Sequence, residues 1–383
     1  MIIYWILFLI PLTISVLPDK LNIKLNNQLI LLYGIICTLF IGFRYQIGGD
    51  WGIYDNWARL INTIDFIEVF NMFSPGYNMM VWISVNLGFG VLLSNTICAL
   101  LFIIGLTIFV KSLPNPWLGY VIAFPYLITV VGMGYSRQAV VIGFSLWCFD
   151  IWRKNNKFST LKILILASIA ITFHKTGLLI FFLVLINSHG NYFRFKNLLF
   201  FIPLALGFFY YLISVNLGAT LSYYFAQSNI IKTGQAVAYG AQARAFLNIP
   251  ATILFFYFYK DFRVFGDRRL WTIIAIVSVI FFIIAPFYTT IIDRLALFLI
   301  SFQMLVYSRL TKIIKNNFYR FALIYSVCGF YILIFTVWLF YSLSSYMWIP
   351  YKINLFQSNS LYETLGDQRD YNDDPKFKRF KIE

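Results

Sequence analysis

The sequence predicts an all-α protein that crosses a membrane many times, and three observations lead to this fold class. The 383 residues are 60% hydrophobic, 20% aromatic and only 12% charged, a composition unlike that of soluble domains. Apolar runs of spanning length recur along the chain, and a helix satisfies every backbone hydrogen bond within such a run. No polar stretch is long enough for a separate soluble domain, so we expect a single multi-pass membrane domain over residues 1–383.

About 12 transmembrane helices are expected, within a range of 11–14. The first begins at Ile2, because Met1–Leu17 has neither the basic leader nor the small-residue cleavage site of a signal peptide. A short apolar stretch, Gly76–Leu87, is bounded by Pro75 and Gly88 and is expected to be a re-entrant or interfacial helix. The runs expected to span are 2–17, 28–43, 91–110, 117–131, 135–152, 161–173, 178–186, 198–215, 249–259, 270–285, 295–307 and 321–341.

Lysine and arginine counts predict the orientation of these helices. If residues 76–87 do not cross and residues 174–177 form a turn, one set of alternating loops holds 17 basic residues and the other holds 7. The basic set is 18–27, 111–116, 153–162, 187–197, 260–269 and 308–320; the other set is 44–75, 132–138, 174–177, 216–248 and 287–294. Basic loops face the cytoplasm. Segment 44–90 and the large loop 216–248 are therefore predicted to lie outside, as are both chain ends and the charged tail 342–383.

Composition and motifs exclude several function classes. The net charge of +15 follows from the cytoplasmic loops, so no nucleic-acid partner is expected. The four cysteines lie inside apolar runs without CxxC spacing, and no Walker loop, HExxH, GxSxG, dinucleotide fingerprint or Asp-x-Asp pair is present. We therefore expect neither a metal nor a cofactor.

The segment Phe43–Trp57, read FRYQIGGDWGIYDNW, is the most unusual stretch of the chain. It follows an apolar run and carries Arg44, Asp50 and the Gly48-Gly49 pair. Charge at a membrane exit is costly and often functional. A solvated loop with an aromatic belt is the alternative.

Four arginines on the predicted outer side each come from a different loop or span end, where the positive-inside rule disfavours them. Each one alone is explained by snorkelling at a helix end, but together they can converge on one anion. Arginine suits phosphate because its planar fork binds bidentately and stays charged. The ligand is expected to be a lipid-linked phosphate or pyrophosphate at the membrane lipid headgroups, with these candidate binding residues: Arg44, Arg137, Arg244 and Arg294.

Two residues are candidates for the catalytic base. Asp50 adjoins flexible glycines and is expected to be kept ionised by Arg44. His174 has the better unperturbed pKa, but Lys175 and the arginines oppose its protonation. We therefore assign Asp50 as the base and His174 as a ligand-binding residue. The unusual charges cluster at one face of the membrane, and the chain shows no repeated halves. Both features favour an enzyme over a flippase of lipid-linked oligosaccharide. The chemistry of these residues does not separate a polymerase from an O-antigen ligase.

Four segments, in order, resemble the EpsG/Wzy-type polysaccharide polymerases. They are the segment at 43–57, SPGY at Ser74–Tyr77, GYSRQAVVIGF at Gly134–Phe144 and FHKTGLLIFF at Phe173–Phe182, with looser likeness at Asp293-Arg294 and Trp348–Lys352. The resemblance implies a metal-independent membrane glycosyltransferase of the bacterial cytoplasmic membrane. Such enzymes join O-antigen or exopolysaccharide repeat units carried on undecaprenyl pyrophosphate, and a chain-length regulator is an implied partner. It also implies functional roles for Arg44, Asp50, Arg137, His174 and, less directly, Arg294. The candidate role of Arg244 rests on the predicted topology alone.

Overall fold

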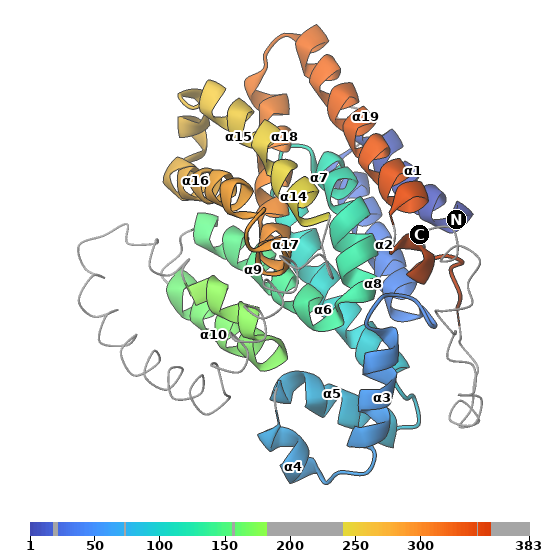
Figure 1. The fold of residues 1–383 in the computed structure, drawn as a ribbon. Helices are drawn as coiled ribbons and strands as arrows, with labels where there is room; N and C mark the ends of the chain where they lie inside the picture. The colour runs from blue at the N-terminus through green and yellow to red at the C-terminus, as the bar shows by residue number, and fades with distance from the viewer. Residues whose placement is uncertain (18–21, 73, 155–157, 182–239, 343, 354–383) are drawn as a thin grey trace, which may run out of the picture.

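Helices make up the regular structure of the computed structural model, which describes residues 1–17, 22–72, 74–154, 158–181, 240–342 and 344–353 (Figure 1). The described residues contain no strand beyond an isolated antiparallel bridge between Arg44 and Ile353. The predicted all-α class is confirmed for this part of the chain.

Five helices in the described residues are long and apolar enough to cross a membrane. Three of them are single helices: α2 (Ile23–Gly42), α6 (Leu92–Lys111) and α19 (Asn317–Tyr341). The fourth, Pro116–Gly134, is a continuous helix formed by α7 (Pro116–Ala123), η2 (Phe124–Val131) and α8 (Gly132–Gly134). The fifth, Ile291–Ile313, runs through α17 (Thr289–Ala296), η5 (Leu297–Leu299) and α18 (Ile300–Ile313). This agrees with a polytopic membrane protein. The number of about 12 stays a prediction, because the expected run 198–215 lies outside the described residues.

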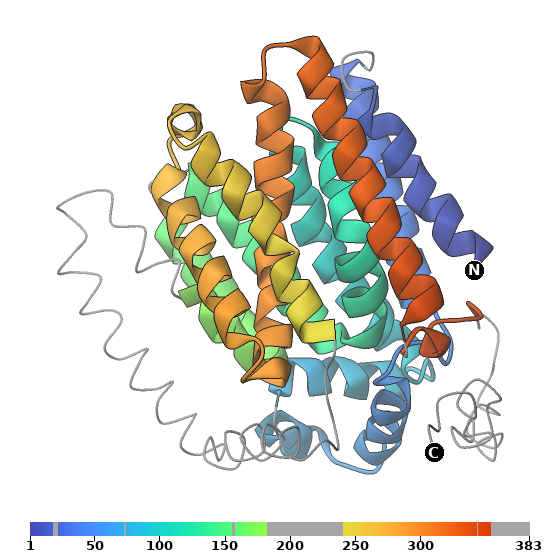
Figure 2. The same ribbon diagram turned by 45° about the horizontal axis from the view of Figure 1, so that its top comes forward.

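Other helices run beside these five, as Figure 2 shows. They are α1 (Ile2–Ser15), α9 (Ser136–Lys154), α10 (Ser159–Phe173), α14 (Gly240–Phe246), α15 (Asn248–Tyr257) and α16 (Arg268–Ile284). Helix α10 ends before His174, a short turn η3 (Lys175–Gly177) follows, and helical backbone resumes at Leu178. The predicted break at 174–177 is therefore present.

Capping residues place two helix starts earlier than hydropathy does. Helix α2 was expected from residue 28, but the Asn22 side chain accepts a hydrogen bond from the Lys24 backbone at 3.1 Å and α2 begins at Ile23. Helix α19 was expected from residue 321, yet Asn316 caps it at Asn317. An asparagine oxygen satisfies an unpaired N–H of the first turn, so a helix extends past its apolar part.

Helices α6 and α9 cross closely at the centre of the bundle because each has a glycine at the contact. A Cβ on Gly105 of α6 would lie 1.9 Å from the Gly143 carbonyl oxygen, and a Cβ on Gly143 would lie 2.6 Å from the Phe102 Cα atom. Small residues let membrane helices approach in this way. The crossing fixes α9, which carries Arg137 in its first turn.

Three short helices cover one end of the bundle: α3 (Trp51–Ile61), α4 (Phe66–Asn71) and α5 (Pro75–Asn86). At about 18 Å, α5 is too short to cross a hydrocarbon core of about 30 Å. Figure 2 shows it lying across the ends of the longer helices. The short apolar stretch at 76–87 therefore forms a helix that does not span by itself.

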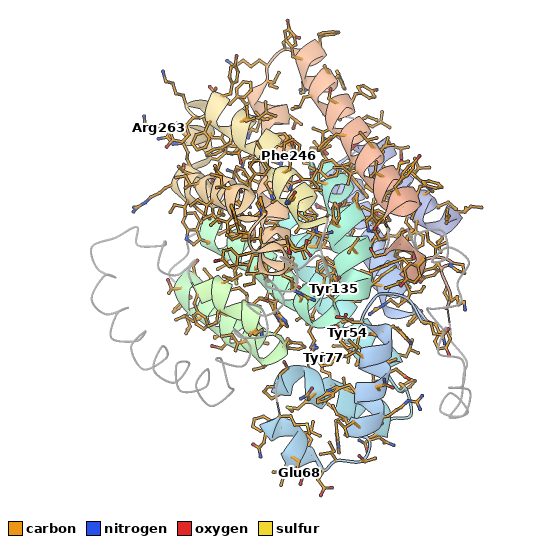
Figure 3. All side chains as sticks on the ribbon, in the orientation of Figure 1. Tyr54, Glu68, Tyr77, Tyr135, Phe246 and Arg263 are labelled. Carbon is orange, nitrogen blue, oxygen red and sulfur yellow. The ribbon has the colours of Figure 1, made fainter. Side chains whose placement is uncertain are left out.

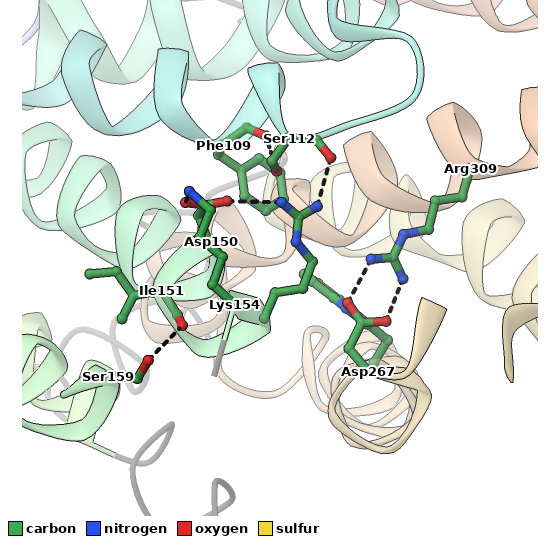
Figure 4. A network of polar contacts seen from close by, with 10 residues as sticks. Phe109, Ser112, Asp150, Ile151, Lys154, Ser159, Asp267 and Arg309 are labelled. Carbon is green, nitrogen blue, oxygen red and sulfur yellow. Dashed lines mark hydrogen bonds and ion pairs between the residues drawn. The ribbon is translucent and has the colours of Figure 1, made fainter. Parts of the chain in front are cut away.

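Among the described residues, contacts at the two ends of the bundle involve loops from the two different predicted sets. At the first, the Asp50 end, Arg44 hydrogen-bonds to Ser136. At the other, the Arg309 end, Arg153 donates to the Ser112 carbonyl oxygen and Arg309 pairs with Asp267 (Figure 4). Helix α6 runs between them over about 30 Å. These contacts join described loops of the same predicted set, while loop 187–197 and most of loop 216–248 lie outside the described residues.

Candidate functional site

The Arg44 guanidinium anchors the loop that follows α2. It is 1% exposed and donates from Nη1 to the Ile41 carbonyl oxygen at 2.7 Å and from Nη2 to Ser136 Oγ at 2.7 Å and Asn95 Oδ1 at 3.2 Å. Asn95 belongs to α6 and Ser136 to α9. Arg44 therefore ties three helices together beneath the site surface.

A segment near the C-terminal end of the described chain holds the same loop from the other side. Tyr45 N donates to the Lys352 carbonyl oxygen and Gly48 N to that of Met347, both at 3.0 Å. Trp348 is buried and its indole N–H donates to the Thr129 carbonyl oxygen at 3.0 Å. On the opposite side, a Cβ added to Gly48 would lie 2.3 Å from the carbonyl oxygen of Met133 in α8. The loop before Asp50 is therefore clamped between α8 and residues 347–352, which gives the looser sequence likeness at 348–352 a structural basis.

Asp50 stands at the start of α3, half-buried, with no capping hydrogen bond from its side chain. Burial raises its pKa above that of an ordinary carboxyl group, and the guanidinium groups of Arg294 and Arg137 act in the opposite direction. Arg44, which the sequence analysis expected to keep Asp50 ionised, turns inward to Asn95 and Ser136 instead. The cations beside Asp50 come from α17 and α9.

Aromatic rings hold Arg137. Its guanidinium carbon lies 5.8 Å from the ring centre of Tyr54 and 5.5 Å from that of Tyr77, both of which are buried. A cation over an aromatic face is attracted by the ring quadrupole. Figure 3 labels both tyrosines where α3 and α5 meet the long helices, so Arg137 is fixed at the Asp50 end.

Arg294 is held in a similar way, by Tyr135 just before α9 and by Gln138 of α9. Its guanidinium carbon lies 4.8 Å from the Tyr135 ring centre (Figure 3), and Nη1 donates to Gln138 Oε1 at 3.3 Å. Gln138 Nε2 in turn donates to the Arg294 carbonyl oxygen at 2.9 Å. This reciprocal pair joins α9 to α17. Two predicted arginines, Arg137 and Arg294, thereby act on the same carboxylate, that of Asp50.

His174 is neutral and has a defined tautomer. Its Nδ1 accepts from the Thr176 backbone N–H at 3.3 Å and lies 2.8 Å from the Thr176 hydroxyl. The proton of a neutral ring whose Nδ1 accepts is on Nε2. Burial, and then Arg137, Arg294 and Lys175, lower the His174 pKa to about 3. The imidazole therefore presents an N–H donor near two arginines.

Arg244 lies beside this group but is engaged by a carboxylate. Its Nε donates to Asp293 Oδ1 and its guanidinium carbon lies 5.7 Å from the Tyr126 ring centre. Because Asp293 precedes Arg294 on α17, the ion pair fixes α17 against α14. Arg44 thus donates to three protein oxygens and Arg244 is paired with a carboxylate. Asp50, Arg137, His174 and Arg294 form one electrostatic group.

Several supporting residues were not singled out from sequence as site residues: Asn95, Gln138, Tyr77 and Trp348. Asn95 carries the clearest sequence signal, because a polar side chain inside an apolar helix usually has a specific partner. Among the described residues, no three His, Cys, Asp or Glu side chains are grouped as metal ligands would be. The arrangement can hold a polyanion and place a basic carboxylate beside it.

No curated protein and no solved structure matches the chain. The model of the EpsG family matches residues 27–353, a range that includes all six predicted site residues and the clamp at 347–352. The chain therefore belongs to the EpsG family.

Proposed function

We propose that the protein joins oligosaccharide repeat units carried on undecaprenyl pyrophosphate into O-antigen or exopolysaccharide, at the outer face of the bacterial cytoplasmic membrane. Family membership supports the role of a membrane polysaccharide polymerase. One observation carries the proposal: a half-buried carboxylate, Asp50, lies with Arg137, Arg294 and a neutral His174 at one end of the bundle.

Asp50 acts as the base in this reaction. A hydroxyl of the acceptor sugar attacks the anomeric carbon of the donor, and Asp50 takes the hydroxyl proton as the new glycosidic bond forms. The bond from that carbon to the carrier pyrophosphate breaks, and its electron pair leaves with the pyrophosphate. A carboxylate with a raised pKa is a stronger base than an exposed one.

Arg137 and Arg294 stabilise the departing pyrophosphate. Charge develops on its oxygens as the bond breaks, and fixed cations stabilise it without reorganising. The tyrosine rings and Gln138 hold both guanidinium groups before the ligand arrives. His174 donates its Nε2–H to a phosphate or sugar oxygen, and its lowered pKa makes it a poor proton acceptor.

Arg44 and Arg244 act as positioning residues in this proposal. The sequence predicted that both would bind pyrophosphate directly. Two Arg44 nitrogens already donate to protein oxygens, and Arg244 is paired with Asp293. Arg44 orients the loop that carries Asp50, and Arg244 orients the helix that carries Arg294. A chain-length regulator is proposed as a partner of the polymerase.

Deleting the protein tests this reaction. The polymerase predicts single repeat units on the lipid carrier or on lipid A core, with no ladder of longer chains. A ligase defect leaves bare core with polymer on the carrier, and a flippase defect traps single units in the cytoplasmic leaflet. One gel with an extraction of carrier lipid separates these results, and long polymer on the carrier in the deletion strain rejects the proposal.

A further inference from the structure

A cavity of about 510 Å³ opens at the Arg309 end, remote from Asp50. Its lining includes four basic side chains, one from α9, two from α18 and one from the first turn of α19: Arg153, Arg309, Lys312 and Arg320. Cavities of this size hold small ligands. The positive-inside bias explains basic residues at this end, but it does not explain their convergence on one hollow.

Two buried carboxylates fix part of this lining. Arg309 is 1% exposed, and its Nη1 and Nη2 each donate to an Asp267 oxygen at 2.6 Å. Arg153 donates to Asp150 Oδ1 at 2.9 Å and to the Ser112 carbonyl oxygen at 2.6 Å (Figure 4). Both guanidinium groups are therefore set in place without a ligand.

The remaining cationic lining comes from Lys312 and Arg320. Lys312 is exposed, and neither Asp150 nor Asp267 pairs with it. Arg320 lies on the first turn of α19 beside Phe318 and Tyr319, which are 75% and 62% exposed. Tyrosine is enriched at the headgroup level of a membrane. The cavity thus combines an excess of positive charge with an interfacial position.

We propose that this cavity binds a phosphate-bearing anion, supplied either by an anionic lipid headgroup or by a soluble phosphorylated molecule. Arg153 and Arg309 are paired with Asp150 and Asp267 and hold the lining in place. The Arg320 guanidinium and the Lys312 ammonium are the lining groups of the type that binds phosphate. The site is separate from the Asp50 end, so the ligand is not the glycan donor. It binds on the side where the charge count places the cytoplasm, and there anionic lipids attract basic residues.

Protection of Lys312 from acylation tests the proposal on the unaltered chain. The full protein is placed in phosphatidylcholine nanodiscs, and Lys312 acylation is followed by mass spectrometry with inorganic pyrophosphate added or phosphatidylglycerol included. Lys260 is the internal control, because it is exposed on a loop of the same set but does not line the cavity. We expect slower acylation at Lys312 and no change at Lys260.

The two arms identify the source of the phosphate. Protection by phosphatidylglycerol alone indicates a headgroup, protection by pyrophosphate alone indicates a soluble ligand, and protection by both supports the shared chemistry. Arg320→Ala should weaken binding about fivefold. The matched Arg263→Ala, exposed on a short 3-10 helix outside the lining, should not weaken it. Equal protection of both lysines, or none at Lys312, overturns the proposal.

Discussion

Replacing Gly48 with alanine perturbs the clamped loop before Asp50. Gly48 has a φ of +100°, and a Cβ added there would lie 2.3 Å from the Met133 carbonyl oxygen and 2.9 Å from the Gly134 Cα atom. Both neighbours are backbone atoms, so no side-chain rotation relieves the overlap. Gly49 is the matched control, since its added Cβ would meet only Met347 Sδ at 3.4 Å.

The cost follows from two effects. A residue with a side chain at positive φ costs roughly 1–2 kcal/mol, and forcing extra volume into packed structure typically costs about 1–3 kcal/mol. Gly48→Ala should therefore lower the free energy of unfolding by about 2–5 kcal/mol, or displace the loop and Asp50 with it. Gly49→Ala should change that free energy by no more than about 0.5 kcal/mol.

Denaturation of the purified variants and the polymer ladder in cells measure these effects together. We expect Gly48→Ala to unfold more easily and to shorten or abolish the ladder. Gly49→Ala should match the unaltered protein in both assays. If Gly48→Ala is as stable and as active as Gly49→Ala, the loop is not clamped as described.

Three further predictions test other parts of the account. Arg137→Lys should lose most polymerase activity despite keeping its charge, because an ammonium group cannot replace the fork; long polymer at normal levels would remove Arg137 from the site. Asp267→Asn should lower the free energy of unfolding by about 3–5 kcal/mol, because it leaves the Arg309 charge buried without its partner; unfolding at the normal denaturant concentration would show that this pair contributes little. Ile67→Cys should react with an impermeant thiol reagent outside intact cells, and Val264→Cys should not. The two sites are 73% and 83% exposed and lie at opposite ends of the bundle, and the native cysteines are buried. The reverse labelling pattern would mean that the predicted topology is inverted.

Hydropathy predicts the helices that follow simple apolar runs. Helix α6, at Leu92–Lys111, lies within one residue of the predicted run, because its boundaries coincide with the change from apolar to polar residues. Helices α2 and α19 begin earlier, because asparagine caps set their starts. The turn at 174–177 was predicted from charge alternation, which depends on the whole chain and not on local hydropathy.

The candidate site was predictable as a group but not in its contacts. Alternation of spans places Asp50, Arg137, His174 and Arg294 on one side, and the structure brings them together there. The inward turn of Arg44 depends on partners 51 and 92 residues away, which no local pattern reveals. In the same way, an ion pair across 49 residues engages Arg244, although both arginines look like free outer cations in the sequence.

The proposed role of Asp50 as the base predicts a pH dependence of turnover. The carboxylate must be deprotonated to accept a proton, so turnover should fall as the pH drops through its pKa. Burial raises that value, so the fall should begin at a higher pH than for an exposed carboxyl group. The His174 pKa of about 3 keeps its ring neutral over the same range, and its protonation should not contribute to the loss.

The central claim, that Asp50 is the base of a glycan polymerase, is tested most directly by Asp50→Asn in membranes supplied with purified lipid-linked repeat units. Asparagine keeps the size of the side chain and removes its basicity, so turnover should be abolished while donor binding survives. His174→Gln is the companion variant, and it should weaken donor binding and retain some turnover. Polymerisation at a normal rate by Asp50→Asn would contradict the account and leave Asp50 as a structural residue of its loop.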